Sequence, residues 1–283
     1  MGKTISFGIQ KGGCGKTTVT AMVATILSRI GFKVLAVDYD SQGNLTQFLT
    51  QRDPYDFTKK TVFEACKALD ARPYIHEINE NLSILTAEDF LAGLNSWIYT
   101  EYAAQLQREG NTDKYAPSKI LMKTLETVKD EYDFILVDLP PNLGELTING
   151  MAASDYAVVI LQAEPFCKSS LERYLETLQH TINVINPDTR LLGILTAMID
   201  SRYLMSQHIL ETTREEYGEL VFDTIIRRKA RVLEYTFEGI SNWNYKADRE
   251  AQQMYISLVD EILKRGGYPN GIEAGSLEEN FRK

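Results

Sequence analysis

A short glycine-rich segment near the start of the chain has the residue types needed to hold a chain of phosphates. Residues 11–18 read KGGCGKTT, between an apolar stretch and a helical one. The three glycines let the backbone curl so that successive N–H groups point inward, and the following helix adds its N-terminal dipole. Lys16 is placed to reach the β- and γ-phosphates, and the Thr17 hydroxyl to ligate Mg²⁺. A turn that only joins strand to helix is the alternative, but the context favours a phosphate site made by Gly12, Gly13, Cys14, Gly15, Lys16, Thr17 and Thr18.

Two further segments place carboxylates at the ends of apolar runs. Asp38 and Asp40 follow the run KVLAV, and Asp138 follows FILV. Acidic side chains at the carboxyl ends of strands beside a phosphate loop can support Mg²⁺ or orient an attacking water. As an alternative, the Asp residues could serve only to cap and stabilise the turn. The phosphate loop one strand away favours a role at the phosphate site instead. After Asp138, a Pro pair stiffens the chain, and Gly144 allows the backbone to approach a γ-phosphate.

The elements that must position these residues alternate between strand-like and helix-like patterns. That alternation predicts an α/β fold, a mostly parallel twisted sheet with helices on both faces. The expected strands cover residues 4–10, 33–37, 82–85, 134–137, 156–161 and 191–197. The expected helices cover residues 17–30, 119–130, 169–185, 204–217 and 248–264.

The domain organisation is expected to be simple. Nothing between the periodic segments has the composition of an interdomain linker, so we expect one domain over residues 1–265. Residues 95–118 are polar and rich in Tyr, which predicts a helix and loop inserted between sheet elements. Residues 266–283 contain Gly, Pro and Asn with little apolar periodicity, and we expect a flexible or loosely docked tail.

Composition limits the classes of partner. The chain has 30 Lys and Arg against 39 Asp and Glu, a net charge of −9, which argues against a surface that is basic throughout. A local basic patch is still allowed, and one window contains four cations, Arg227, Arg228, Lys229 and Arg231. This window predicts contacts with phosphates of DNA. The alternatives are a basic turn exposed to solvent, or a loop beside the adenine of a bound nucleotide.

Cysteine usage and hydropathy indicate the compartment. The 3 cysteines are far apart and do not pair with the 3 histidines at any zinc-like spacing. No apolar run approaches the ~20 residues needed to span a bilayer. We therefore expect a cytoplasmic protein with no membrane association.

These motifs resemble those of the ParA/MinD family of ATPases, which have the P-loop NTPase fold and a deviant Walker A motif, KGGxGK[ST]. Residues 38–46, DYDSQGNLT, are similar to the family's first switch, D-x-D-x-Q-G-N-x-T. The stretch DLPPNLGELTING is similar to its second switch. The resemblance covers about residues 4–264. It is nearest to ParA (Soj-like) partition ATPases that lack an N-terminal helix-turn-helix domain.

The resemblance implies specific roles at the nucleotide. Lys11 would cross a dimer interface to the nucleotide of the partner subunit, and Lys16 would hold the phosphates. Asp40 would position the hydrolytic water. Asp38 and Asp138 would support the Mg²⁺ shell around Thr17, so ATP and Mg²⁺ are the implied cofactors.

The resemblance also implies a cellular role. It predicts an ATPase that is slow until a ParB-like centromere-binding protein stimulates it. With ATP the chain would form a homodimer, bind double-stranded DNA without sequence preference and associate with the nucleoid, in the service of plasmid or chromosome partition. Arg202 and Arg231 match family positions that contact DNA. The family's IPRN stretch reads IRRK here, without the proline, and this leaves the adenine contacts open.

Three alternatives follow from the same chemistry. The chain could be a positioning ATPase that moves a protein assembly, a scaffold gated by nucleotide binding with little hydrolysis, or a MinD-like membrane-associated ATPase. The last is disfavoured because residues 266–283 do not form the basic amphipathic helix that such proteins use.

Overall fold

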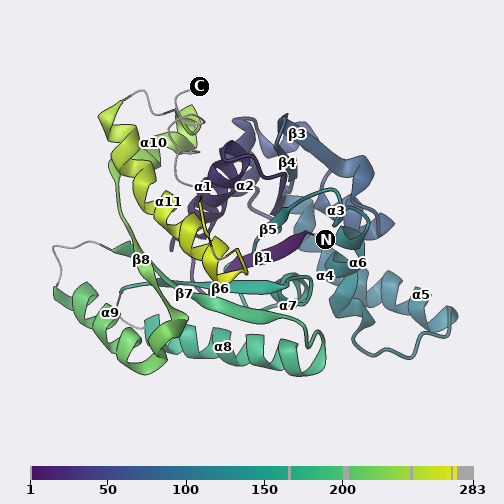
Figure 1. The fold of residues 1–283 in the computed structure, drawn as a ribbon. Helices are drawn as coiled ribbons and strands as arrows, with labels where there is room; N and C mark the ends of the chain where they lie inside the picture. The colour runs from purple at the N-terminus through teal and green to yellow at the C-terminus, as the bar shows by residue number, and fades with distance from the viewer. Residues whose placement is uncertain (1, 165–166, 200–203, 243–244, 269, 273–283) are drawn as a thin grey trace.

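One sheet organises the chain. In the computed structural model, which describes residues 2–164, 167–199, 204–242, 245–268 and 270–272, eight strands pair in the order β3-β4-β2-β5-β1-β6-β7-β8 (Figure 1). The strands are β1 (Lys3–Gly8), β2 (Val34–Asp38), β3 (Ile75–Asn79), β4 (Leu82–Leu85), β5 (Phe134–Asp138), β6 (Tyr156–Gln162), β7 (Arg190–Ile199) and β8 (Val221–Arg227). All neighbouring pairs are parallel except β3 with β4.

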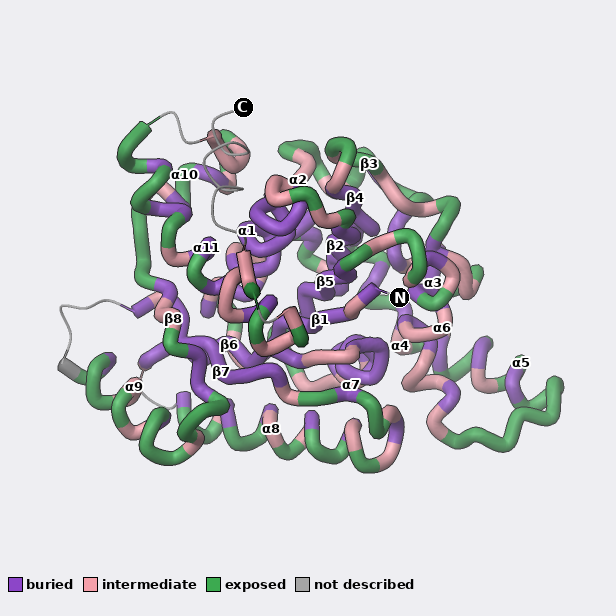
Figure 2. Tube along the Cα trace, in the orientation of Figure 1, coloured by how far each residue is buried: buried purple, intermediate pink, exposed green. Residues whose placement is uncertain are grey.

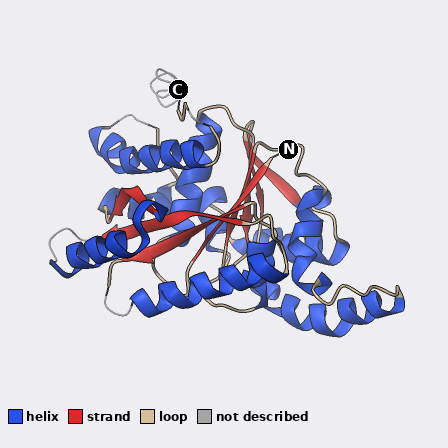
Figure 3. Cartoon of the chain, turned by 60° about the horizontal axis from the view of Figure 1, so that its bottom comes forward, coloured by secondary structure: helices blue, strands red, loops and turns tan. Residues whose placement is uncertain are grey.

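Helices cover both faces of this sheet, as Figure 3 shows. They are α1 (Lys16–Arg29), α2 (Asn44–Thr50), α3 (Val62–Ala68), α4 (Leu94–Trp97), α5 (Ala103–Arg108), α6 (Ile120–Glu126), α7 (Glu145–Ala152), α8 (Cys167–Val184), α9 (Leu204–Tyr217), α10 (Ala230–Glu238) and α11 (Lys246–Arg265). Helix α1 packs against α2 and α11 on one face, and α7 packs against α6 and α8 on the other. The α/β class expected from the sequence is confirmed.

The central strands are the most deeply buried part of the fold. Every residue of β2 and β5 is buried, and so is most of α1 (Figure 2). Strands covered on both faces read as unbroken apolar runs rather than alternating ones. For this reason the sequence located the six expected strands with ends shifted by at most two residues.

Two strands were not expected, and one helix is shorter than expected. Strands β3 and β8 lie at the two edges of the sheet and are only partly buried, so neither has a long apolar run. The helix expected over residues 119–130 ends at Glu126, because the next residues form tighter turns. In these turns the N–H of Val128 bonds to Leu125 O at 3.1 Å, and that of Glu131 bonds to Val128 O at 2.9 Å.

The structure describes the whole of the expected insertion and part of the expected tail. Residues 94–108 run through α4, a π-helical stretch over Ile98–Tyr102 and α5, and the chain then returns by a loop. In the tail, the Tyr268 ring packs 5.9 Å from that of Phe32 and 5.6 Å from that of Phe134. This part of the tail is therefore docked on the core, and residues 273–283 lie outside the described residues.

The helices offer no bilayer-spanning element. Among the described residues, none of them combines the length and the apolar character needed to cross a membrane.

The end of β1 is positioned by a tight contact with α8. A Cβ atom added to Gly8 would lie 1.9 Å from the hydroxyl oxygen of Tyr174. Tyr174 is fully buried, and its hydroxyl has no hydrogen-bond partner among the described residues. The absence of a side chain at Gly8 thus allows α8 to approach the strand that leads into the glycine-rich loop.

We predict that Gly8→Ala lowers the free energy of unfolding by about 1–3 kcal/mol, the usual cost of overpacking a core. Tyr174→Phe alone is expected to be nearly neutral, because it removes a hydroxyl that has no hydrogen-bond partner among the described residues. In the double variant Tyr174→Phe should recover part of the loss, since the atom nearest to the new methyl group is gone. Urea denaturation of the four proteins tests this coupling, and strictly additive effects would contradict it.

Candidate functional site

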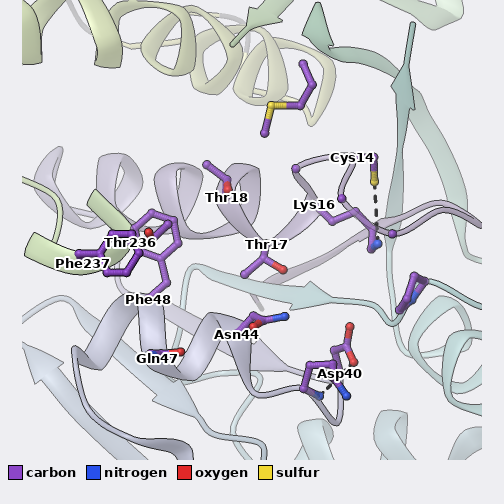
Figure 4. A pocket seen from close by; sticks show the side chains of 16 residues that line it. Cys14, Lys16, Thr17, Thr18, Asp40, Asn44, Gln47, Phe48, Thr236 and Phe237 are labelled. Carbon is purple, nitrogen blue, oxygen red and sulfur yellow. Dashed lines mark hydrogen bonds between the residues drawn. The ribbon is translucent and has the colours of Figure 1, made fainter. Parts of the chain in front are cut away.

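The carboxyl ends of three adjacent central strands meet at one edge of the sheet. In the parallel register, Phe7 of β1 and Asp38 of β2 each lie opposite Asp138 of β5. The segments that follow these strands surround a cavity of about 540 Å³ (Figure 4). The glycine-rich loop, residues 12–18, lines it, as do residues of the segment after β2 and of α10. The structure thus brings together the segments that the sequence singled out.

The shape of the glycine-rich loop depends on left-handed glycines. Gly13 has φ +73° and Gly15 has φ +85°, a region that other residues rarely adopt. A Cβ atom on Gly12 or Gly13 would have no atom within 4 Å, so this part of the loop faces open space. A Cβ atom on Gly15 would lie 2.7 Å from the methyl carbon of Met198. The loop is closed on one side by β7 and open on the side where phosphates would lie.

Lys16 supplies the main positive charge of the loop. Its side chain is 6% exposed, and its Nζ donates to the backbone oxygen of Lys11 at 3.1 Å. In the described part of the chain Lys16 forms no ion pair. A buried charge is expensive unless it has a partner. The cavity therefore contains a buried ammonium group that forms no ion pair with the described carboxylates.

Asp138 and Thr17 form a hydroxyl–carboxylate pair below the loop. The Thr17 hydroxyl donates to Asp138 Oδ2 at 2.6 Å, and that of Thr20 donates to Oδ1 at 3.4 Å. Burial, reinforced by the nearby Asp38 charge, raises the pKa of Asp138 to about 8. Among the described residues, no group of three or more His, Cys, Asp or Glu is arranged as a metal cage. One carboxylate and one hydroxyl nevertheless fit Mg²⁺, which commonly binds through few protein oxygens together with substrate phosphates.

Asp38 and Asp40 have different surroundings although they are two residues apart. Asp38 is fully buried, and its Oδ2 accepts from both the N–H and the hydroxyl of Thr46 at 2.8 Å. Burial raises its pKa to about 7, although the Thr46 hydrogen bonds oppose the shift. Asp40 lines the cavity, and its Oδ1 accepts from the N–H of Gln42 at 3.2 Å. Asp38 thus holds the turn in place, and Asp40 presents a carboxylate to the cavity.

Lys11 and Gly144 lie at the margins of the site. Lys11 Nζ is 2.7 Å from Glu164 Oε2 of the same chain, in a pair that is about one-third to one-half exposed. Gly144 precedes α7, and its N–H donates to Asn142 Oδ1 at 2.9 Å. Neither residue lines the cavity, whereas Pro141 of the same segment as Gly144 does. The roles expected for Lys11 and Gly144 therefore stay predictions.

The basic window divides into two groups. Arg227, Arg228 and Lys229 are exposed at the end of β8, and within the described residues none of them forms an ion pair. Arg231, by contrast, is bound by carboxylates: Nε lies 2.6 Å from Asp248, and Nη1 lies 2.7 Å from Glu234 and 3.1 Å from Glu238. Arg231 is therefore not part of the exposed group at the end of β8, and the DNA contact expected of it stays a prediction. Arg202 lies outside the described residues.

Several cavity residues were not among those expected. Asn44, Gln47 and Phe48 lie on α2, Asn44 within the first switch motif and the other two directly after it. Their proximity in sequence to Asp40 could have indicated them. Met198, Thr236 and Phe237 come from β7 and α10, and no local motif marks them.

The raised pKa of Asp138 has a consequence for stability. A carboxyl whose pKa rises on folding favours the folded state below its ordinary pKa near 4, and that contribution is lost as the pH rises through the folded value of about 8. We predict that Asp138→Asn raises the free energy of unfolding of the nucleotide-free chain by more than about 1 kcal/mol at pH 8, and that the gain disappears near pH 4.

Thermal unfolding across this pH range, without Mg²⁺ or nucleotide, checks the prediction. Asp188→Asn, at an exposed position with no ion pair among the described residues, is the matched control. If Asp138→Asn is no more stable than the unaltered chain at pH 8, the ionised Asp138 carboxylate does not lower the free energy of unfolding, and the prediction is wrong.

Comparison with known proteins agrees with this geometry. A family model described as an AAA domain matches residues 2–191. The chromosome-partitioning ATPase Soj of Treponema pallidum is 33% identical, with 94% of this chain and 99% of that protein covered. The sporulation initiation inhibitor protein Soj of Bacillus subtilis is 31% identical, with 94% and 100% covered.

A solved structure shares the fold. Cobyrinic acid a,c-diamide synthase from Mycobacterium smegmatis, with a bound ATP analogue and magnesium, is 25% identical, with a TM-score of 0.77 and 96% of this chain and 98% of that chain covered. The matched domain and the Soj relatives identify the family, and this shared fold agrees with them. The chain belongs to the ParA/MinD family of ATPases and resembles its Soj/ParA members over nearly its whole length.

Proposed function

We propose that this protein binds ATP with Mg²⁺, dimerises in that state, binds DNA without sequence preference and releases it after hydrolysis. The buried Lys16 ammonium in an open glycine loop is the observation that carries the proposal. It is a cation without a carboxylate partner among the described residues, at the N-terminus of α1. The loop N–H groups, the helix dipole and this ammonium together favour a polyanion over any neutral ligand.

The residues below the loop suit the metal that accompanies a nucleoside triphosphate. Thr17 and Asp138 would hold Mg²⁺ together with the phosphates, and Asp38 would keep the neighbouring turn in position. When bound, the metal neutralises charge on the β- and γ-phosphates. Asp40, whose carboxylate faces the same cavity, would orient an attacking water.

Dimerisation would use Lys11. In the single chain its ammonium is paired with Glu164, and both side chains are substantially exposed. Exposed ion pairs of this kind contribute about 0–1 kcal/mol, so little free energy opposes release of the lysine. Lys11 could then add a positive charge to the triphosphate held by the partner subunit.

The exposed cations at the end of β8 support a DNA-binding role. Arg227, Arg228 and Lys229 form a small basic patch on a chain whose net charge is −9. One such patch would bind DNA weakly, and pairing two in an ATP-bound dimer would raise the affinity by avidity. Binding would then depend on the nucleotide state.

The cellular role follows from the relatives. Because the T. pallidum relative is named a chromosome-partitioning ATPase, we infer that this chain serves partition of a chromosome or plasmid in the cytoplasm, on the nucleoid. A ParB-like centromere-binding partner would stimulate an otherwise slow hydrolysis.

Two substitutions separate nucleotide binding from hydrolysis. Lys16→Ala should weaken ATP binding by about 10- to 100-fold, because charge-assisted hydrogen bonds contribute roughly 1.5–3 kcal/mol each. Asp40→Ala should leave ATP affinity within about threefold while lowering the hydrolysis rate about 100-fold. Calorimetric titration and phosphate release measure the two effects. Normal turnover by Asp40→Ala would disprove the role of Asp40.

The DNA patch can be tested with charge-matched variants. The double variant Arg227→Gln, Arg228→Gln should lose at least about tenfold in ATP-dependent DNA affinity at 0.1 M salt, with a weaker salt dependence. The control, Lys59→Gln with Lys60→Gln, removes the same charge from exposed positions next to β3, which lies at the opposite edge of the sheet from β8. Filter binding with ATP, ADP and no nucleotide is the measurement. Equal losses of DNA affinity in both double variants would contradict the proposal. DNA binding that does not depend on the nucleotide would also contradict it.

A further inference from the structure

The cavity has two chemically different ends. Lys16 and the glycine-rich loop form the polar end, where phosphates would bind. At the other end lie two aromatic side chains, Phe48 of α2 and Phe237 of α10 (Figure 4). Gln47 and Thr236 border them and carry hydrogen-bonding groups. Such a cavity matches a ligand with an anionic tail and a flat apolar ring.

The two aromatic rings differ in exposure. Phe48 is 4% exposed and belongs to the core, so it forms a fixed floor. Phe237 is 81% exposed, the highest fraction among the exposed large apolar side chains of the described residues. Helix α10 buries its other face, with Val232 and Tyr235 packed in the core. The helix is therefore anchored, while Phe237 stands at the rim of the cavity with most of its ring uncovered.

Helix α10 is held in this position by polar contacts on several sides. Arg231 is bound to the buried carboxylate of Asp248 at 2.6 Å, and Tyr235 donates to the same oxygen at 2.9 Å. Hydrogen bonds from Ser241, Arg231 and Tyr235 outweigh the effect of burial and hold the pKa of Asp248 below its ordinary value. Gln51, at the C-terminal end of α2, donates from Nε2 to the backbone oxygen of Tyr235 at 3.5 Å and so links α2 to α10. Phe237 thus projects from a preorganised element, and preorganisation reduces the entropy lost on binding.

We propose that Phe237 is a base-stacking residue, on which the purine ring of the bound nucleotide lies, with Phe48 as the floor of this subsite. The inference rests on the proposed function, since it assumes that the phosphates occupy the loop. Gln47 and Thr236 are placed to bond to the base edge or the ribose. Arg231 then has a positioning role, because its ion pairs hold the helix that carries Phe237.

The proposal predicts how much of the affinity belongs to the base. Stacking of a base on an aromatic side chain typically changes affinity by about 5- to 100-fold, and every base has a face to stack. A purine covers more of the ring than a pyrimidine does. We therefore expect a preference for purine over pyrimidine triphosphates that depends on Phe237, while the affinity for inorganic tripolyphosphate does not.

The test compares Phe237→Ala with Leu233→Ala in the full chain, with Mg²⁺ present. Leu233 lies one turn earlier on α10, is 66% exposed and does not line the cavity, so it is a matched control. Calorimetry measures the affinities for a non-hydrolysable ATP analogue and for tripolyphosphate. Phe237→Ala should lower the affinity for the analogue about tenfold and the affinity for tripolyphosphate by less than twofold. Leu233→Ala should change neither, and Phe237→Tyr should keep the affinity of the unaltered chain.

The outcomes separate this proposal from the proposed function. If Phe237→Ala binds the analogue as tightly as the unaltered chain does, base stacking is wrong, although nucleotide binding stands. If it loses affinity for tripolyphosphate to the same extent, the effect comes from the loop and the stacking role is likewise overturned. If the unaltered chain binds neither ligand, the proposed function itself fails. Thermal unfolding of each variant confirms that the comparison is made between folded proteins.

Discussion

The parallel register that sets Phe7 and Asp38 opposite Asp138 is the constraint on which the site depends. It brings the ends of β1, β2 and β5 to one edge of the sheet, so that three segments separated by up to about 130 residues share a cavity. Helix α1 follows directly from the first of these segments, and its N-terminus faces the same space. A shift of one strand would separate Thr17 from Asp138 and leave the loop without its acidic neighbours.

Within this frame the site holds charges that the rest of the fold does not neutralise. Lys16 forms no ion pair in the described part of the chain, and burial raises the pKa values of the Asp38 and Asp138 carboxyls. Each of these features costs stability in the empty chain. A ligand carrying both phosphates and a divalent cation would satisfy them together, which links binding to the stability of the site.

Charged residues that are neighbours in sequence have different roles in space. Arg227, Arg228 and Lys229 face solvent, whereas Arg231 is drawn into a cluster with Asp248, Glu234 and Glu238. The difference arises because α10 begins at Ala230, and the helix turns Arg231 toward α11. The same helix carries Phe237 to the cavity. The four cations are close together in the sequence, but in the structure three of them are exposed and the fourth forms ion pairs that hold α10 against α11.

The sequence by itself determined the parts of this protein that depend on neighbouring residues. The loop KGGCGKTT, the acidic strand ends and the apolar central strands were recognisable because backbone curvature, helix initiation and burial on both faces of the sheet are read over a few consecutive positions. Only the tertiary structure decided that Phe237, Thr236 and Met198 line the same cavity as Lys16, and that Arg231 is engaged by carboxylates. These contacts join segments far apart in the chain, and the packing of α10 against α2 and α11 determines them. No local pattern encodes such packing, because it depends on how whole elements fit together.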